Sequence, residues 1–377
     1  MKKIISTLLI TCFVAVSVYA DSPFKFAVSE DISYDDNIYL TKNDTKSSII
    51  SSTQLFAEYL NNIPNSGLKF GAKANIGYNA YSEAAAKNDY MNAGVGVNLS
   101  NSKFFLDENF LFTADPATSE LTERAKRINN IASFRFKTSL EKMFSIGFLV
   151  SDIYDNYVDD DFSALNKNRV NFGVQAYYNL SPKTSFYLGY LLSRIDYEKE
   201  SVKESFGNSI SLGVNGKIAK KIKGTAQISY DTRSYDKEVE HADRNTSLFG
   251  YLLALTYEPT IRNSIELSGE RKMEESTFAN NRYYVSTEIA AKYKQKIYTK
   301  WTAGILVAYE NMAYPETVND INRVDNLIKV RPSIEYKFKD NLFATLWYQL
   351  RNKTSNYDSD NVEYLDNKVG AQIKFCF

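Results

Sequence analysis

Few residues of this chain are suited to catalysis. The 377 residues contain one histidine, His241, within the polar segment 239–243. Hydrolases that work near neutral pH generally place a histidine beside a serine or aspartate, because the nucleophile or water must be activated. A histidine in a solvated loop needs no chemical role. The sequence therefore predicts a protein that is not an enzyme and that uses no cofactor.

Metal ligands are equally sparse. One histidine and Cys376 cannot complete a closed zinc site, which takes four ligands. The acidic segments 159–161 and 35–37 offer the oxygen ligands that calcium prefers, but neither has the glycine and ligand spacing of a helix-loop calcium site. Solvated loop charge accounts for both segments. We predict no metal site, with calcium binding by these loops as the open alternative.

Charged residues recur instead at alternate positions of extended segments. If the apolar residues of each segment face lipid, the residues between them form a hydrated wall with charges of both signs. Such a wall passes polar solutes and excludes apolar ones. The alternative is that these charges pair across strands and brace the wall. The predicted pore-lining residues are Arg127, Arg135, Lys137, Arg169, Asp231, Arg233, Glu266, Glu270, Arg282, Glu288, Lys292, Lys329, Arg331, Glu335, Lys337, Arg351 and Lys374.

A long series of amphipathic strands must position these residues. Apolar residues alternate with polar ones in one segment of residues 24–377 after another, and short turns alternate with longer polar connections. We count about 18 strands, with 16 as the alternative, which is wide enough for an aqueous channel. The sequence thus predicts an all-β fold, a transmembrane antiparallel up-and-down barrel with short periplasmic turns and longer extracellular loops. Pro332 predicts a bulge or an irregular strand within residues 329–338, because proline cannot donate a ladder hydrogen bond.

The end of the chain carries the clearest alternation. Val369, Ala371, Ile373, Phe375 and Phe377 share one face of a strand that ends on an aromatic residue. In a soluble protein this pattern would indicate only a half-buried strand. Bacterial outer-membrane barrels close with such a strand, whose side chains alternate between lipid and a polar lumen. Phe375 and Phe377 are therefore the predicted assembly signal.

The start of the chain predicts export. Lys2 and Lys3 precede an apolar stretch at residues 4–18, and Ala20 offers a small residue for cleavage, so residues 1–20 are predicted to be a cleaved signal peptide. A lipoprotein signal at Cys12 is the alternative, but Thr11 is a poor residue before a lipidated cysteine. No later segment approaches the roughly 20 apolar residues of a membrane helix. Residues 21–377 are predicted to form a single domain in the cell outer membrane.

Composition agrees with this location. The chain has 45 basic and 45 acidic residues, so no field for nucleic acid is expected. Once Cys12 is removed with the signal, Cys376 is the remaining cysteine, and a disulfide within the chain is excluded. The 28 tyrosines and 23 phenylalanines suit the aromatic girdles that flank the apolar band of a barrel.

The first predicted strand carries a family resemblance. Tyr34 is followed by Asp35, Asp36, Asn37 and Ile38. This segment resembles the opening strand of the putative β-barrel porin 2 family, whose members begin with an aromatic-Asp-Asp-Asn-apolar motif. The resemblance implies an outer-membrane channel without catalytic residues, and some relatives are found beside exopolysaccharide synthesis. Many lysines and asparagines and few glycines depart from the family pattern, which leaves subfamily and substrate open.

Three functions follow as hypotheses. The first is a porin-like outer-membrane channel for passive diffusion of small hydrophilic solutes. The second is an accessory of exopolysaccharide export, in which Tyr177, Trp347 and Gln349 bind sugars. The third is a surface or structural barrel without a channel, whose loops 155–167 and 236–244 bind other molecules. The expected partners are outer-membrane lipid and lipopolysaccharide, the barrel-assembly machinery, periplasmic chaperones and further copies of the chain in a homo-oligomer.

Overall fold

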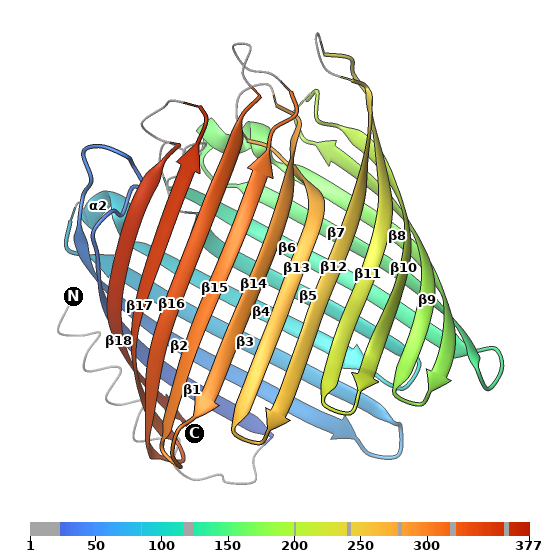
Figure 1. The fold of residues 1–377 in the computed structure, drawn as a ribbon, viewed down its shortest axis with the longest axis horizontal. Coiled ribbons are helices and arrows are strands. Elements are labelled where there is room, and N and C mark those ends of the chain that lie inside the picture. Colours follow the sequence, from blue (N-terminus) through green and yellow to red (C-terminus); the bar gives the residue numbers. More distant parts are fainter. Residues whose placement is uncertain are drawn as a thin grey trace.

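The computed structural model describes residues 23–377 apart from residues 84, 116–123, 200, 240–242, 278–280, 317–321 and 358–361. The predicted signal peptide and His241 lie outside the described residues. The described chain forms one closed sheet in which each strand pairs antiparallel with its sequence neighbours and the first strand pairs with the last (Figure 1). The sheet has 18 strands, which confirms the predicted barrel and its preferred strand count.

The strands are 11 to 16 residues long. Two short helical segments, α2 (Ala85–Asn88) and the 3-10 helix η1 (Asp160–Leu165), lie in connections between strands. The strands are β1 (Phe24–Asp35), β2 (Ser48–Ile63), β3 (Leu68–Tyr81), β4 (Tyr90–Ser100), β5 (Phe104–Asp115), β6 (Ala125–Ser139), β7 (Phe144–Tyr157), β8 (Lys167–Ser181), β9 (Thr184–Tyr197), β10 (Ser205–Ala219), β11 (Ile222–Tyr235), β12 (Asn245–Thr260), β13 (Asn263–Glu275), β14 (Tyr283–Lys296), β15 (Trp301–Ala313), β16 (Val324–Lys339), β17 (Leu342–Ser355) and β18 (Tyr364–Cys376).

The two faces of the wall differ in polarity because side chains alternate along each strand. On β18, Val369 and Ile373 are 52% and 61% exposed, as expected of residues on the outer face of a barrel. Contacts between strands that are not neighbours identify the inner face. Arg169 in β8 pairs with Glu275 in β13, and such distant strands meet only across the interior. The exposed apolar face is therefore the outer face of the barrel.

The two ends of the barrel carry different connections. At one end the turns are short, and Lys220 and Lys221 alone join β10 to β11. At the other end the connections are longer and hold α2 and η1. Figure 1 shows α2 at the upper left of the barrel and the C-terminus among the short turns at the bottom. We call these the long-connection end and the short-turn end.

The barrel closes between β1 and β18. Their ladder runs from Ala27 opposite Cys376 to Asp35 opposite Lys368. Beyond it, the backbone N–H of Phe377 donates to the carbonyl of Phe26 at 2.8 Å. Val369, Ala371 and Ile373 lie on the outer face, which confirms the register predicted for the closing strand.

The Asp-Asp-Asn segment, which begins at the last residue of β1, stabilises the same seam at the long-connection end. The carboxylate of Asp36 accepts hydrogen bonds from the backbone N–H and the amide of Asn367, at 2.7 and 2.8 Å. The buried amide of Asn37 donates to the carbonyl oxygens of Leu365 and Thr41, at 2.9 and 2.7 Å. The residues that carry the family resemblance thus join the first strand to the last.

Pro332 interrupts the pairing between β16 and β17 without shifting the register at that point. Between β16 and β17 the pairing passes from Val330 opposite Leu350 to Ser333 opposite Trp347, and the two positions between are unpaired. The register is the same on both sides of Pro332, so the strand is irregular there, as predicted, and a register shift between Lys337 and Lys339 adds a bulge at the end of the same segment. Among the described residues, no helix has the length and the apolar run needed to cross a membrane.

Candidate functional site: the inner wall of the barrel

The predicted pore-lining residues share the inner face of the wall. Each one that lies in a strand alternates with the exposed apolar residues of that strand, and Arg282 directly precedes β14. The ladders of β5 to β8, β11 to β14 and β15 to β18 keep this register from strand to strand. The structure therefore brings together residues that are up to 247 positions apart, from Arg127 to Lys374.

Several inner cations lie on aromatic rings. The ammonium of Lys137 is 3.7 Å from the ring centroid of Tyr177, and the guanidinium of Arg331 is 4.6 Å from that of Trp347. The indole N–H of Trp347 donates to Asp31 on β1 at 2.8 Å. Each cation thus rests on a ring face, where the electron-rich surface attracts it. These contacts link charged and aromatic residues on the inner face of the wall.

Other inner charges pair along and between strands. Lys292 and Glu266, on neighbouring strands, are 3.1 Å apart, and Arg127 and Asp155 are 2.9 Å apart. Such pairs hold long side chains against the wall and leave charges of both signs on the interior surface. Both sequence-based interpretations, pore lining and bracing, fit these contacts.

A denser network closes the seam at the long-connection end. Arg351 pairs with Asp366 at 2.7 Å, and Lys368 lies 3.7 Å from Asp35. The carboxylates of Asp35, Asp36 and Asp366 have oxygens within 4.8 Å of one another. Because Arg351 and Lys368 already supply positive charge there, we assign this cluster to the seam. Asp160 and Asp161, from the other acidic segment, form the first turn of η1.

A second cluster crosses the interior. The carboxylate of Glu275 contacts Lys167 at 3.0 Å, Arg233 at 3.1 Å and the guanidinium of Arg169. These cations come from β8 and β11, whereas Glu275 ends β13. The side chain of Glu275 is 5% exposed, so the pairs form away from bulk water. This cluster joins three parts of the wall near the long-connection end.

The end of β13 departs from the wall to make these contacts. Its ladder with β12 stops at Arg271, opposite Tyr251, whereas its ladder with β14 continues to Glu275 opposite Tyr283. Arg282, directly before β14, is buried; its guanidinium lies 4.1 Å from the ring centroid of Tyr235 on β11 and pairs with Glu316 at 2.6 Å. The β13–β14 end is therefore fixed against the inner face of β11.

Sequence reasoning missed Lys167 and Glu275. Lys167 ends the loop predicted at residues 155–167, and Glu275 lies in a polar segment beyond the alternating part of its strand. In the outer register of β13, shared with Leu267, Glu275 would also face outward if the strand ran straight. Arg271 is a second charged residue in this register, so the charge of Glu275 alone does not signal the bend.

Charged groups at the outer rim of the long-connection end also pair. Both terminal nitrogens of Arg194 donate to Asp236, at 2.9 and 2.6 Å, and these hydrogen bonds lower the pKa of the Asp236 carboxyl. Hydrogen bonds from Tyr154 and Asn166 likewise lower the pKa of Glu198. Both carboxylates are therefore ionised at neutral pH and exposed to solvent.

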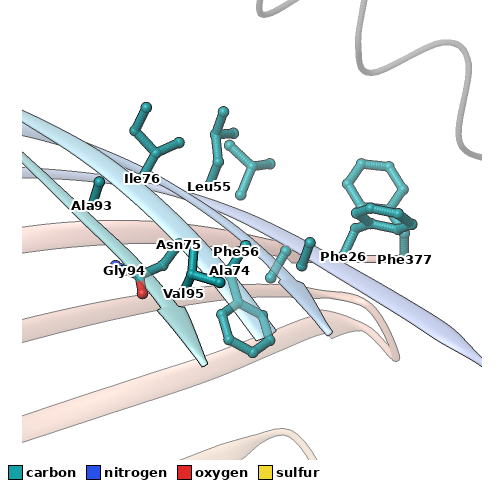
Figure 2. A pocket seen from close by; sticks show the side chains of 13 residues that line it. Phe26, Leu55, Phe56, Ala74, Asn75, Ile76, Ala93, Gly94, Val95 and Phe377 are labelled. Atoms are coloured by element: carbon teal, nitrogen blue, oxygen red, sulfur yellow. The ribbon is translucent and has the colours of Figure 1, made fainter. Parts of the chain in front are cut away.

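The outer face has an apolar hollow of about 480 Å³ across β1 to β4. The hollow forms because three small side chains, those of Ala57, Ala74 and Ala93, lie between larger ones. Figure 2 shows Leu55 and Ile76 pointing to one side of the sheet and Phe56 to the other. The hollow belongs to the apolar outer face and is separate from the charged interior.

Comparisons with known proteins agree with this architecture. The family model described as Putative beta-barrel porin 2 matches residues 148–377. No curated protein matches the chain.

Solved outer-membrane structures share the fold. OccK2 (OpdF) of Pseudomonas aeruginosa is similar with a TM-score of 0.55 and 9% identity, over 94% of this chain and 98% of that one. OpdK of Pseudomonas aeruginosa gives a TM-score of 0.52 and 9% identity, over 94% and 99% of the two chains. OccAB4 of Acinetobacter baumannii gives 0.50 and 12%, over 94% and 98%. At these identities the similarity shows a common fold.

Proposed function

The chain belongs to the Putative beta-barrel porin 2 family, and from this premise we propose that it is an outer-membrane channel for passive diffusion of small hydrophilic solutes. In the outer membrane, the short-turn end would face the periplasm and the long-connection end would face the outside of the cell, as in bacterial barrels generally. The exposed apolar face then meets lipid, and the polar face surrounds the path of the solute.

The inner register of the charged residues carries this proposal. A closed ring of 18 strands is in the size range that leaves an aqueous lumen. Arg135, Lys137 and Arg331 face the interior together with Glu266 and Glu288. A wall with charges of both signs hydrates small polar solutes and gives apolar ones no favourable contact. We propose that the predicted pore-lining residues act in this way.

The sugar-binding alternative gains no support from the inner aromatic rings. Tyr177 carries Lys137 on its ring and packs 5.9 Å from the ring centroid of Tyr187. Trp347 carries Arg331 on its ring and donates to Asp31. Both rings are therefore already engaged within the wall. No observation favours the export or purely structural functions over diffusion.

The proposed location implies the remaining partners. The outer face would contact outer-membrane lipid and lipopolysaccharide, and the barrel-assembly machinery would insert a chain delivered by periplasmic chaperones. We propose that Phe375 and Phe377 form the assembly signal, since β18 and its terminal aromatic residue close the barrel. We also propose that the chain forms a homo-oligomer and that a cleaved signal peptide directs its export. We propose no catalytic function for it.

Reconstitution tests the channel directly. Purified, refolded protein added to a planar lipid bilayer should give discrete steps of ohmic current in potassium chloride, because ions cross a hydrated lumen. Protein kept unfolded in urea is the control, since it supplies the same chain without a barrel. Folded protein that inserts but stays silent at every voltage would rule out the diffusion channel.

A further inference from the structure

The cluster around Glu275 resembles a ligand site that is already filled. One carboxylate receives Lys167, Arg169 and Arg233, and its side chain is 5% exposed. Ionised groups at this depth need partners, because the loss of hydration is costly. One cation would neutralise the carboxylate of Glu275, and three surround it. The cluster therefore keeps an excess of positive charge.

The positive excess points into the interior. Lys167 and Arg169 lie in the inner register of β8, and Arg233 lies in that of β11. The adjoining pair of Arg282 and Glu316 is neutral in sum and does not offset it. The Nε of Arg169 is buried without a hydrogen-bond partner among the described residues. The site thus offers both charge and a donor beyond what Glu275 uses.

The position of Glu275 allows exchange. It lies four residues past Arg271, the last residue of β13 that pairs with β12. Its own ladder partner is Tyr283, on the strand to the other side. Breaking a buried ion pair is costly when one charge is left alone, but a second carboxylate that takes the same place restores the pairing. A neutral solute cannot do this.

We infer that Lys167, Arg169 and Arg233 form a carboxylate-binding site whose resident ligand is Glu275, and that acidic solutes exchange with Glu275 as they pass. The inference rests on the proposed channel and adds the class of solute that it favours. Glu275 acts as an internal competitor: it holds the site closed to neutral solutes and yields it to a carboxylate. Arginine and lysine around the site supply the charge-assisted hydrogen bonds that carboxylates accept.

Current recordings with a matched pair of solutes test the site. Succinate, added on the side of the long connections, should interrupt the single-channel current of the wild-type protein, whereas succinamide of similar shape should not. Glu275→Gln removes the internal competitor, so the apparent dissociation constant of succinate should fall about tenfold. Arg169→Gln and Arg233→Gln remove ligand-binding cations, so each should weaken the interruptions at least about tenfold.

Glu198→Gln is the control, because it removes one negative charge from a solvated connection outside the cluster. It should leave the response to succinate at the wild-type level. Heat-modifiable mobility on gels establishes that each variant is folded, and the arginine variants test the site even if Glu275→Gln does not fold. Equal interruptions by succinate and succinamide, or equal responses of Glu275→Gln and Glu198→Gln, would overturn the site while the channel stands. Absence of current from folded wild-type protein would overturn both proposals.

Discussion

Ile228→Arg is the most informative substitution for the orientation of the wall. Ile228 lies in the middle of β11 and is 64% exposed on the outer face. Its ladder partners, Leu212 on β10 and Tyr251 on β12, are apolar or aromatic and offer no carboxylate. An arginine on the lipid face at the bilayer midplane costs about 2–4 kcal/mol. We expect the free energy of unfolding to fall by this amount.

Position 228 is a cleaner probe than position 373. Ile373 lies opposite Glu30, whose carboxylate is on the outer face and accepts hydrogen bonds from Ser51 and Thr53 at 2.6 and 2.5 Å. An arginine at position 373 would therefore gain a partner, and part of its cost would be offset. Ile228 has no such neighbour among its ladder partners.

Ser229→Arg is the matched control on the adjacent, inner position. Ser229 donates to Asp231 at 2.9 Å, so an arginine there would meet a carboxylate in a polar interior. Its cost should stay below about 1 kcal/mol, as for a charge near water. Urea titrations in lipid vesicles, followed by heat-modifiable mobility, measure both values. Equal costs for the two variants, or a larger cost for Ser229→Arg, would refute the assignment of faces.

Three further predictions concern closure and the backbone. Deleting Phe377 removes its bond to Phe26 and its ring contact with Phe375, so the heat-modifiable fraction in isolated outer membranes should fall, whereas Phe377→Tyr should retain it. Asn37→Ala removes the hydrogen bond to Leu365 across the β1–β18 seam and the bond to Thr41 in the connection that follows β1, and it should lower the unfolding free energy by about 1–3 kcal/mol. A urea midpoint equal to that of the wild type would contradict the role of Asn37 in the seam. At Gly224, which has φ +147°, an added Cβ would overlap the carbonyl of Ala254, whereas Gly67 at φ +67° has open space for a Cβ. Gly224→Ala should therefore lower the folded yield far more than Gly67→Ala. Equal yields of the two variants would contradict this.

The alternation of apolar and polar residues predicted the strands because one side of a barrel wall is apolar and the other side is polar. Ile373 and Gln372 fall on opposite faces in the ladder with β1, as their polarity predicts. The same rule placed Arg135 and Lys292 in the inner register without knowledge of their neighbours. A period of two is a local property, and a sequence displays it directly.

Contacts between distant strands could not be predicted in this way. Glu275 meets Lys167 and Arg233 because the end of β13 leaves β12, and no local pattern fixes that bend. The partners of Asp36 and Asn37 on β18, Asn367 and Leu365, lie more than 300 residues away along the chain, so the local sequence could not show that this segment belongs to the seam. Pairing across a closed ring depends on the geometry of the whole sheet.

If the inner register lines an aqueous path, a water-soluble thiol reagent should reach it, and single-channel current before and after thiol modification measures this access. Ser268 and Leu267 are adjacent on β13, with Ser268 in the inner register and Leu267 exposed on the outer face. Each is changed to cysteine in a Cys376→Ser background and treated with a water-soluble cationic methanethiosulfonate. We expect a stepwise fall in current for Ser268→Cys and an unchanged current for Leu267→Cys. A current that responds at position 267 and not at position 268 would show that the inner register does not line the aqueous path.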